Sequence, residues 1–244
     1  MTLNRPAVRN ALDVRLRTDL RAVMAGLDAD EEVDVVVLTG ADPAFCAGLD
    51  LKQLGSSGEN LSTSARDDGV PSRFPWAPLT KPVIGAVNGV AVTGGLELAL
   101  NCDILIASER ARFADTHARV GVLPGWGLSV LLPLMVGRGL ARRMSLTGDF
   151  LSADAALRAG LVTEVVPHED LLPAARRVAA SIVGNDQAGV RALLRSYRGI
   201  EAALVGDGWQ IEAATSAGWR AGFDPAEVER RRVGVIDRGR SQTA

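Results

Sequence analysis

The sequence predicts an α/β fold, in which short strands alternate with helices and helices alone complete the chain. Runs of β-branched residues at 33–38 and 104–107 are typical of strands that are buried in a sheet. Turn residues and stretches with helical spacing follow these runs through about Val166. Further helical runs begin near Glu169, Asp186 and Asp224. We therefore expect an alternating core followed by a helical tail.

The composition excludes several classes of protein. With 244 residues, of which 47% are apolar and 23% charged, the chain fits one large globular domain or one domain with a helical appendage. A net charge of −2 provides no basic face for nucleic acid. Residues 120–137 carry no charge, but Pro124 and Pro133 interrupt them, so we expect a buried turn and a core helix there and no membrane span.

Cysteine and histidine are too few for a disulfide scaffold or a metal centre. Cys46 and Cys102 lie in no metal-binding spacing, and there are only two histidines. The first ten residues lack the apolar core of a signal peptide. These observations predict a cytoplasmic protein in a reducing environment, without a bound metal.

The N-terminal residues predict one strand-turn-helix unit. Residues 2–5 are interpreted as the end of a strand that turns at Pro6, and Asp13 as the cap of a helix to about residue 27. The strand at 33–38 completes the unit. The first strand is short, so either the strand itself is shortened or the chosen start lies inside the natural coding sequence.

The next two segments are predicted to be irregular. Residues 41–51 are expected to form a loop with small residues at Ala47 and Gly48. This loop either offers a second set of free N–H groups or is an ordinary connection between a strand and a helix. Residues 52–80 are rich in Gly and Ser and contain few apolar anchors. We expect a mobile segment there, either a lid or a disordered loop.

A glycine turn follows the most apolar stretch of the chain. Residues 82–92 are interpreted as a buried strand leading into a tight turn at Asn88 and Gly89. Gly94 then opens a helix, where unpaired N–H groups and the helix dipole favour an oxyanion. Glu97, one turn further on, is either a cap of that helix or a working acid or base.

The residues from 128 to 166 predict further helices and one more strand. Residues 128–136 and 140–146 are expected to be helical, and Ser152 is expected to cap a short helix that ends at Gly160. Residues 161–166 are the last expected strand. Pro225 suits the first turn of the final helix.

Several motifs together resemble the crotonase family, the enoyl-CoA hydratase/isomerase superfamily. They are LNRP at 3–6, AFCAGLDL at 44–51, KPVIGAVNGVAVTGGLELALNCDI at 81–104, VGVLPGWG at 120–127 and LTGDFLSADAALRAGLV at 146–162. The motifs occur in family order and cover most of residues 3–166.

The resemblance implies a spiral of ββα units over residues 1–185 and a C-terminal helical region over residues 186–244 that builds homotrimers or dimers of trimers. It also implies an acyl-CoA thioester as the ligand, with no separate cofactor because coenzyme A is part of the substrate. Leu49 and Gly94 would supply the two backbone N–H groups that hold the thioester oxygen. The residues implied in CoA binding are Ala47, Asp50, Leu51 and Lys52, with Arg5 either near the CoA phosphates or simply at the surface.

The chain departs from the family pattern at the second acid/base position. Typical hydratases use two glutamates, one of which matches Glu97, while the other position falls on His117. Imidazole exchanges protons near neutral pH, so His117 is either a substitute or a loop histidine bonded to a neighbour such as Asp115. His168 is expected to be structural.

The resemblance leaves two classes of function open. The first is an enoyl-CoA hydratase-like enzyme that uses Glu97 and His117, with isomerisation or another enolate reaction as its nearest alternative. The second is an acyl-CoA binding protein that has lost catalysis, since His117 replaces a carboxylate. The shortage of charges at 120–136 favours an apolar acyl group.

Overall fold

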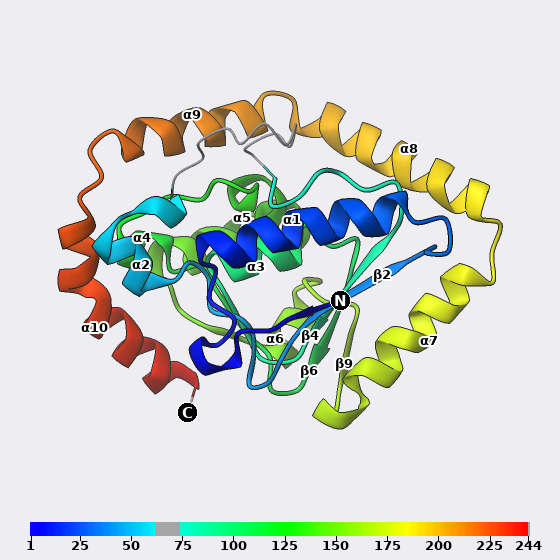
Figure 1. The fold of residues 1–244 in the computed structure, drawn as a ribbon, viewed down its shortest axis with the longest axis horizontal. Helices are drawn as coiled ribbons and strands as arrows, with labels where there is room; N and C mark the ends of the chain where they lie inside the picture. The colour runs from blue at the N-terminus through cyan, green and yellow to red at the C-terminus, as the bar shows by residue number, and fades with distance from the viewer. Residues whose placement is uncertain (62–73, 244) are drawn as a thin grey trace.

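The computed structural model describes residues 1–61 and 74–243. Two β-sheets form the interior, helices cover them, and the C-terminal helices run around the outside (Figure 1). The segment expected to be mobile, 52–80, lies partly outside the described residues. Its described start is helical, because helix α2 spans Leu51–Ser56 and a 3-10 turn follows at Glu59–Leu61.

The two sheets are built from alternate strands of the chain. The first has the order β1-β2-β4-β6-β9 and is parallel, whereas the second has the order β3-β5-β7-β8 with β8 antiparallel. The strands of the first sheet are β1 (Thr2–Leu3), β2 (Val36–Gly40), β4 (Val83–Val87), β6 (Ile104–Ser108) and β9 (Glu164–Val166). Those of the second are β3 (Ala44–Cys46), β5 (Val90–Val92), β7 (Arg112–Ala114) and β8 (Leu151–Ser152).

The chain passes from the first sheet to the second three times and forms a helix after each of these passages. The strand pairs β2-β3, β4-β5 and β6-β7 are followed by α2, α3 (Gly94–Leu100) and α4 (His117–Val120). This repeat is the ββα spiral expected from the family resemblance. The predicted loop at 41–51 therefore contains β3, which is too short to be recognised from its own three residues.

The buried strand predicted within 82–92 is β4, and the tight turn expected at Asn88 and Gly89 leads into a strand that was not predicted separately, β5, which lies in the other sheet. Asn88 holds the crossing. Its Oδ1 accepts the Gly40 N–H at 3.2 Å, and its amide donates to the Ala44 carbonyl at 3.3 Å. A Cβ at Gly89 would lie 2.4 Å from a carbonyl oxygen of the neighbouring turn, so only glycine fits.

The remaining helices of the core are α1 (Val14–Ala29), α5 (Leu128–Thr147) and α6 (Ala153–Arg158). As predicted, Asp13 caps α1 by accepting the Leu16 N–H at 2.7 Å, and Ser152 caps α6. The two predicted helical pieces at 128–136 and 140–146 form α5, which is interrupted at Gly137 by non-helical angles of φ 77° and ψ 156°.

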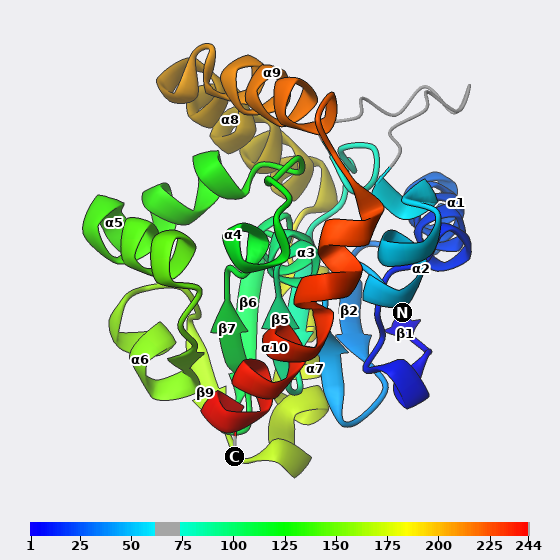
Figure 2. The ribbon, with the colours of Figure 1, turned by 90° about the vertical axis from the view of Figure 1, so that its left-hand side faces the viewer.

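The tail consists of α7 (Leu171–Val183), α8 (Gln187–Val205), α9 (Gly208–Arg220) and α10 (Pro225–Thr243). Helix α7 packs its buried Leu171 against Ile84 and Ile106 of the first sheet. Helices α8 and α9 then arch over the molecule, and α10 returns beside α2 and α4 (Figures 1 and 2). In the described part of the chain, no helix combines the length and apolar character that a bilayer span requires.

Candidate active site

Helix α3 is buried along its entire length, and a glycine lets it approach the second sheet. All seven of its residues are buried. A Cβ at Gly95 would lie 2.1 Å from the Cys46 carbonyl oxygen of β3. The absence of a side chain therefore lets the first turn of α3 rest directly on the end of β3.

The start of α3 meets the loop that follows β3. Gly48 has a φ of +85°, and a Cβ there would lie 3.4 Å from the Gly94 nitrogen. Thr93, which precedes α3, has a φ of +56°, a strained angle for a β-branched residue. Its hydroxyl is 2.7 Å from that of Thr116, which ties the turn to the segment before α4. Two glycine-containing turns are thus held side by side.

Two backbone N–H groups in these turns take no part in the regular hydrogen-bond pattern. Leu12 donates to the Gly48 carbonyl and accepts from the Asp50 N–H, so the Leu49 N–H between them takes no part. Gly94 opens α3, where N–H groups have no partner inside the helix. Among the described residues, neither the Leu49 nor the Gly94 nitrogen donates a hydrogen bond to another backbone carbonyl in these turns.

Glu97 reaches across from α3 to another loop and does not cap its own helix. Only 4% of the residue is exposed. One carboxylate oxygen, Oε1, accepts the Gly125 N–H at 3.0 Å and the Trp126 N–H at 2.7 Å. The other oxygen, Oε2, lies 3.6 Å from Nε2 of His117. The geometry therefore favours the acid/base interpretation over the capping interpretation.

His117 lies between two carboxylates. Its Nδ1 is 2.6 Å from Oδ1 of Asp115, and the same oxygen accepts its backbone N–H at 3.1 Å. Its Nε2 faces Glu97. The bond to Asp115 that was expected of a loop histidine is therefore present, and the other ring nitrogen faces Glu97.

Burial and neighbouring charges shift the pKa values of His117 and Asp115. Burial opposes the charge on His117, but hydrogen bonds to Asp115 and Glu97, together with their negative charges, raise the pKa of His117 to about 10. Burial also opposes the charge on Asp115, yet the hydrogen bond and charge of His117 hold the pKa of Asp115 below its usual range. The raised pKa favours the imidazolium form of the His117 ring at neutral pH.

A small cavity of about 50 Å³ brings these groups together. Leu49, Gly94, Glu97 and His117 all line it, as the family resemblance predicts. Its wall also contains groups that the sequence did not indicate, namely Arg17 of α1 and Ser216 and Arg220 of α9. The Arg17 guanidinium stacks 5.1 Å above the ring of Trp126.

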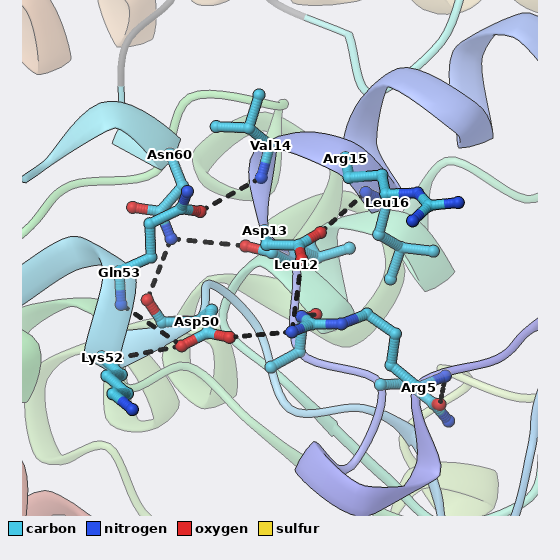
Figure 3. A network of polar contacts seen from close by, with 12 residues as sticks. Arg5, Leu12, Asp13, Val14, Arg15, Leu16, Asp50, Lys52, Gln53 and Asn60 are labelled. Carbon is cyan, nitrogen blue, oxygen red and sulfur yellow. Dashed lines mark hydrogen bonds and ion pairs between the residues drawn. The ribbon is translucent and has the colours of Figure 1, made fainter.

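The segment from Ala47 to Lys52 is fixed by Asp50, which is at the centre of a polar network (Figure 3). Oδ1 of Asp50 accepts N–H groups at the start of α2, including that of Lys52 at 3.1 Å, while Oδ2 lies 3.2 Å from the Arg5 guanidinium. Arg5 also lies 3.2 Å from Asp13. The Ala47 N–H donates to the Arg9 carbonyl. Leu51 is half-buried, whereas Lys52 is exposed.

A third buried carboxylate near the site, Glu212, was not indicated by the sequence. Glu212 of α9 accepts the Gly127 N–H and the Ser129 N–H, each at 2.6 Å. Burial, followed by the negative charge of Glu97, raises the pKa of Glu212. No motif marks this residue, because its role depends on how the tail docks on the core. His168, expected to be structural, contacts Ser108 and Asp42 and does not line this cavity.

Comparisons with known proteins agree with this geometry. The family model "Enoyl-CoA hydratase/isomerase" matches residues 1–204. The chain is 42% identical over 187 residues to a probable peroxisomal enoyl-CoA hydratase of Arabidopsis thaliana, an alignment that covers 77% of this chain and 69% of the relative. A solved enoyl-CoA hydratase from Mycobacterium tuberculosis is 62% identical, with a TM-score of 0.83 over 91% of this chain and 94% of that one. One from Mycobacterium avium is also 62% identical, with a TM-score of 0.81 over 90% and 92%.

Proposed function

Because this chain belongs to the enoyl-CoA hydratase/isomerase (crotonase) family, we propose that it adds water to a trans-2-enoyl-CoA and forms the 3-hydroxyacyl-CoA. The observation that carries the proposal is the arrangement of Glu97. Two backbone N–H groups hold one of its oxygens, and the other faces the His117 ring in a cavity bordered by Leu49 and Gly94. In this proposal a base, an acid and two oxyanion donors surround one small volume.

The N–H groups of Leu49 and Gly94 form the oxyanion hole. When water adds to C3 of the enoyl group, negative charge moves to the thioester oxygen as an enolate. Fixed N–H dipoles stabilise that charge without reorganising, and loss of one donor typically costs on the order of 100 to 1000 fold in rate. The two N–H groups are supported for this role because the turns around Gly48 and Gly94 lie side by side.

Glu97 and His117 divide the two proton transfers. The Glu97 carboxylate takes a proton from water while the water oxygen bonds to C3. The His117 imidazolium gives its proton to C2 of the enolate, which completes the addition. The proton on Glu97 then returns to His117 across the 3.6 Å that separates them, so both groups regain their starting states. The raised pKa of His117 supports the donor role.

CoA binding is assigned to the segment of Ala47, Asp50, Leu51 and Lys52. The Asp50 network supports this assignment because it fixes the backbone that would meet the adenine. The expected contact of Arg5 with the CoA phosphates stays a prediction. In the described structure its guanidinium lies against Asp13 and Asp50, so it can also act by holding the segment in place.

The tail over 186–244 is proposed to assemble the protein into trimers or dimers of trimers. Helix α8 supports this proposal, since none of its residues is buried. Its exposed apolar residues recur on one face, at Leu193, Tyr197, Ile200 and Leu204. A cytoplasmic location is also proposed, and the two buried free thiols of Cys46 and Cys102 are consistent with it.

Product analysis distinguishes hydration from its alternatives. Isomerisation needs as little as one proton-shuttling group, which Glu97 alone provides, and a non-catalytic protein would bind the thioester without changing it. Incubation of the wild-type protein with short and long trans-2-enoyl-CoA should yield 3-hydroxyacyl-CoA. If the protein instead moves the double bond of a 3-enoyl-CoA and hydrates no substrate, the isomerase alternative is favoured. If it binds the thioester without any turnover, the non-catalytic alternative is favoured.

A further inference from the structure

The inference concerns Glu212, a carboxylate of the tail helix α9 that is buried next to the proposed active site. Only 7% of the residue is exposed. Both oxygens are occupied, since Oε1 accepts the Gly127 N–H and Oε2 the Ser129 N–H, each at 2.6 Å. A buried carboxylate is unfavourable unless such donors compensate for its lost hydration, so this contact depends on the docked position of α9.

The loop that Glu212 holds is the same loop that holds Glu97. Gly125 and Trp126 donate to Glu97, and the following Gly127 and Ser129 donate to Glu212. Four N–H groups within five residues are therefore divided between a carboxylate from the core and one from the tail. Because successive peptide planes share a backbone atom, their orientations are linked.

Two further contacts fix the same point of the loop. Gly127 has a φ of +91°, and a Cβ there would lie 2.3 Å from the ring of Trp209, so α9 packs directly on the glycine. Gly127 also precedes α5, whose N-terminal dipole favours the negative charge of Glu212. Burial and the nearby charge of Glu97 oppose that charge and raise the pKa of Glu212.

Glu212 is not placed to meet the substrate at the reacting atoms. It lines a neighbouring cavity of about 440 Å³ together with Ser129 and Ile211, and it is absent from the residues lining the cavity of Glu97 and His117. Its oxygens are already engaged by the loop. Besides the direct interaction between the two negative charges, Glu212 can therefore affect the reaction through the Gly125–Trp126 backbone that holds Glu97.

We propose that Glu212 is a positioning residue, which fixes the 125–129 loop so that the Gly125 and Trp126 N–H groups hold Glu97 in its working orientation. Docking of α9 then sets the geometry of a carboxylate in the core. The effect on catalysis rests on the proposed function of Glu97, whereas the effect on the loop does not.

The test compares Glu212→Gln with Arg198→Ala. Arg198 of α8 is a matched control, because it also anchors the tail to the core, through Asp103 at 3.0 Å, without touching the loop. With a short trans-2-enoyl-CoA, Glu212→Gln should lower kcat about 10 to 100 fold and change KM less than about 3 fold, while Arg198→Ala should change kcat less than about 2 fold. Glu212→Asp keeps the charge but shortens the reach, and its kcat should lie between those of Glu212→Gln and wild type.

Amide hydrogen exchange separates positioning from a general loss of stability. In Glu212→Gln the Gly125 and Trp126 amides, which bond to Glu97 and not to residue 212, should exchange at least about 10 fold faster, and in Arg198→Ala they should not. Faster exchange at Gly127 and Ser129 alone, or equal loss of kcat in both variants, would overturn the proposal. If wild type shows no turnover, the hydratase proposal fails, and the exchange data still decide the role of Glu212. If Glu212→Gln does not fold, the same measurements on Glu212→Asp decide it.

Discussion

His117 is the residue that the family resemblance aligns with a second catalytic glutamate, and it is proposed here as the proton donor. The ring is buried between Asp115 and Glu97, and hydrogen bonds to both, with their charges, raise the pKa of His117 to about 10 despite the cost of burial. In the proposed mechanism the imidazolium form of His117 supplies the proton that a protonated second glutamate would otherwise supply. The proposed replacement therefore keeps a proton donor but makes it a cation instead of a neutral acid.

The first prediction follows from this raised pKa. Below pH 6.5, which is the ordinary pKa of histidine, His117 is protonated in both the folded and the unfolded chain, so its contribution to stability is complete. Between about 6.5 and about 10 only the folded chain keeps the proton, and the contribution is lost as the pH rises. Urea unfolding at several pH values should show a steeper decline for wild type than for His117→Gln. Parallel curves would contradict the raised pKa.

The second prediction concerns the close contact at Gly95. A Cβ there would lie 2.1 Å from the Cys46 carbonyl oxygen, so Gly95→Ala must push α3 away from β3. We expect a loss of about 1 to 3 kcal/mol in the free energy of unfolding, measured with urea. Gly26→Ala is the control, because position 26 lies inside α1 with open space around it, and it should stabilise by about 0.5 to 1 kcal/mol. Equal stability of the two variants would argue against the close packing.

At the level of elements, Asp50 joins the end of the β3 loop to α1 and α2. Its carboxylate caps α2 and pairs with Arg5, and Asn60 donates to both its carbonyl and that of Leu12 (Figure 3). Leu49, whose N–H is proposed as an oxyanion donor, immediately precedes Asp50 in the chain. Loss of the carboxylate should therefore loosen the CoA segment and the oxyanion hole together.

The third prediction is that Asp50→Ala raises KM for the acyl-CoA about 10 fold and lowers kcat less, because the CoA segment loses its fixed backbone. Loss of the α2 cap should cost about 1 to 2 kcal/mol in unfolding free energy. Asp19→Ala, which removes an exposed pair with Arg15, is the control and should change neither quantity measurably. An unchanged KM in Asp50→Ala would exclude the segment from CoA binding.

The elements also show where sequence reasoning succeeds and where it stops. Caps are local, so Asp13 and Ser152 could be assigned from a few neighbouring residues. The crossing at Asn88 could not, because β4 and β5 share one apolar pattern and differ only in which sheet they join. Glu212 and Arg220 reach the site through the docking of α9, a contact between segments that are far apart in sequence.

Across the whole molecule, the tail has two faces with different roles. Helix α9 turns Glu212 and Ser216 into the core, whereas α8 leaves a stripe of Leu193, Tyr197, Ile200 and Leu204 in contact with solvent. The four positions recur every three or four residues, so they share one side of the helix. An apolar stripe of this kind suits an interface with a further copy of the chain.

The fourth prediction is that sedimentation of the wild-type protein gives the mass of a trimer or hexamer, and that Leu204→Glu gives a smaller species. The charge would be buried without a partner if α8 lies in the interface. Arg195→Glu, a charge reversal outside the stripe, should leave the mass unchanged. A monomeric wild type at micromolar concentration would contradict the assembly.

The most direct test of the account is the rate of hydration of a short trans-2-enoyl-CoA by wild type and by Glu97→Gln, with thioester binding measured in parallel. Glutamine keeps the shape of the side chain but cannot accept the proton of water. We expect kcat to fall on the order of 100 to 10,000 fold while the affinity for a non-reactive acyl-CoA changes little. Wild-type turnover that survives in Glu97→Gln would show that the reaction does not depend on this carboxylate.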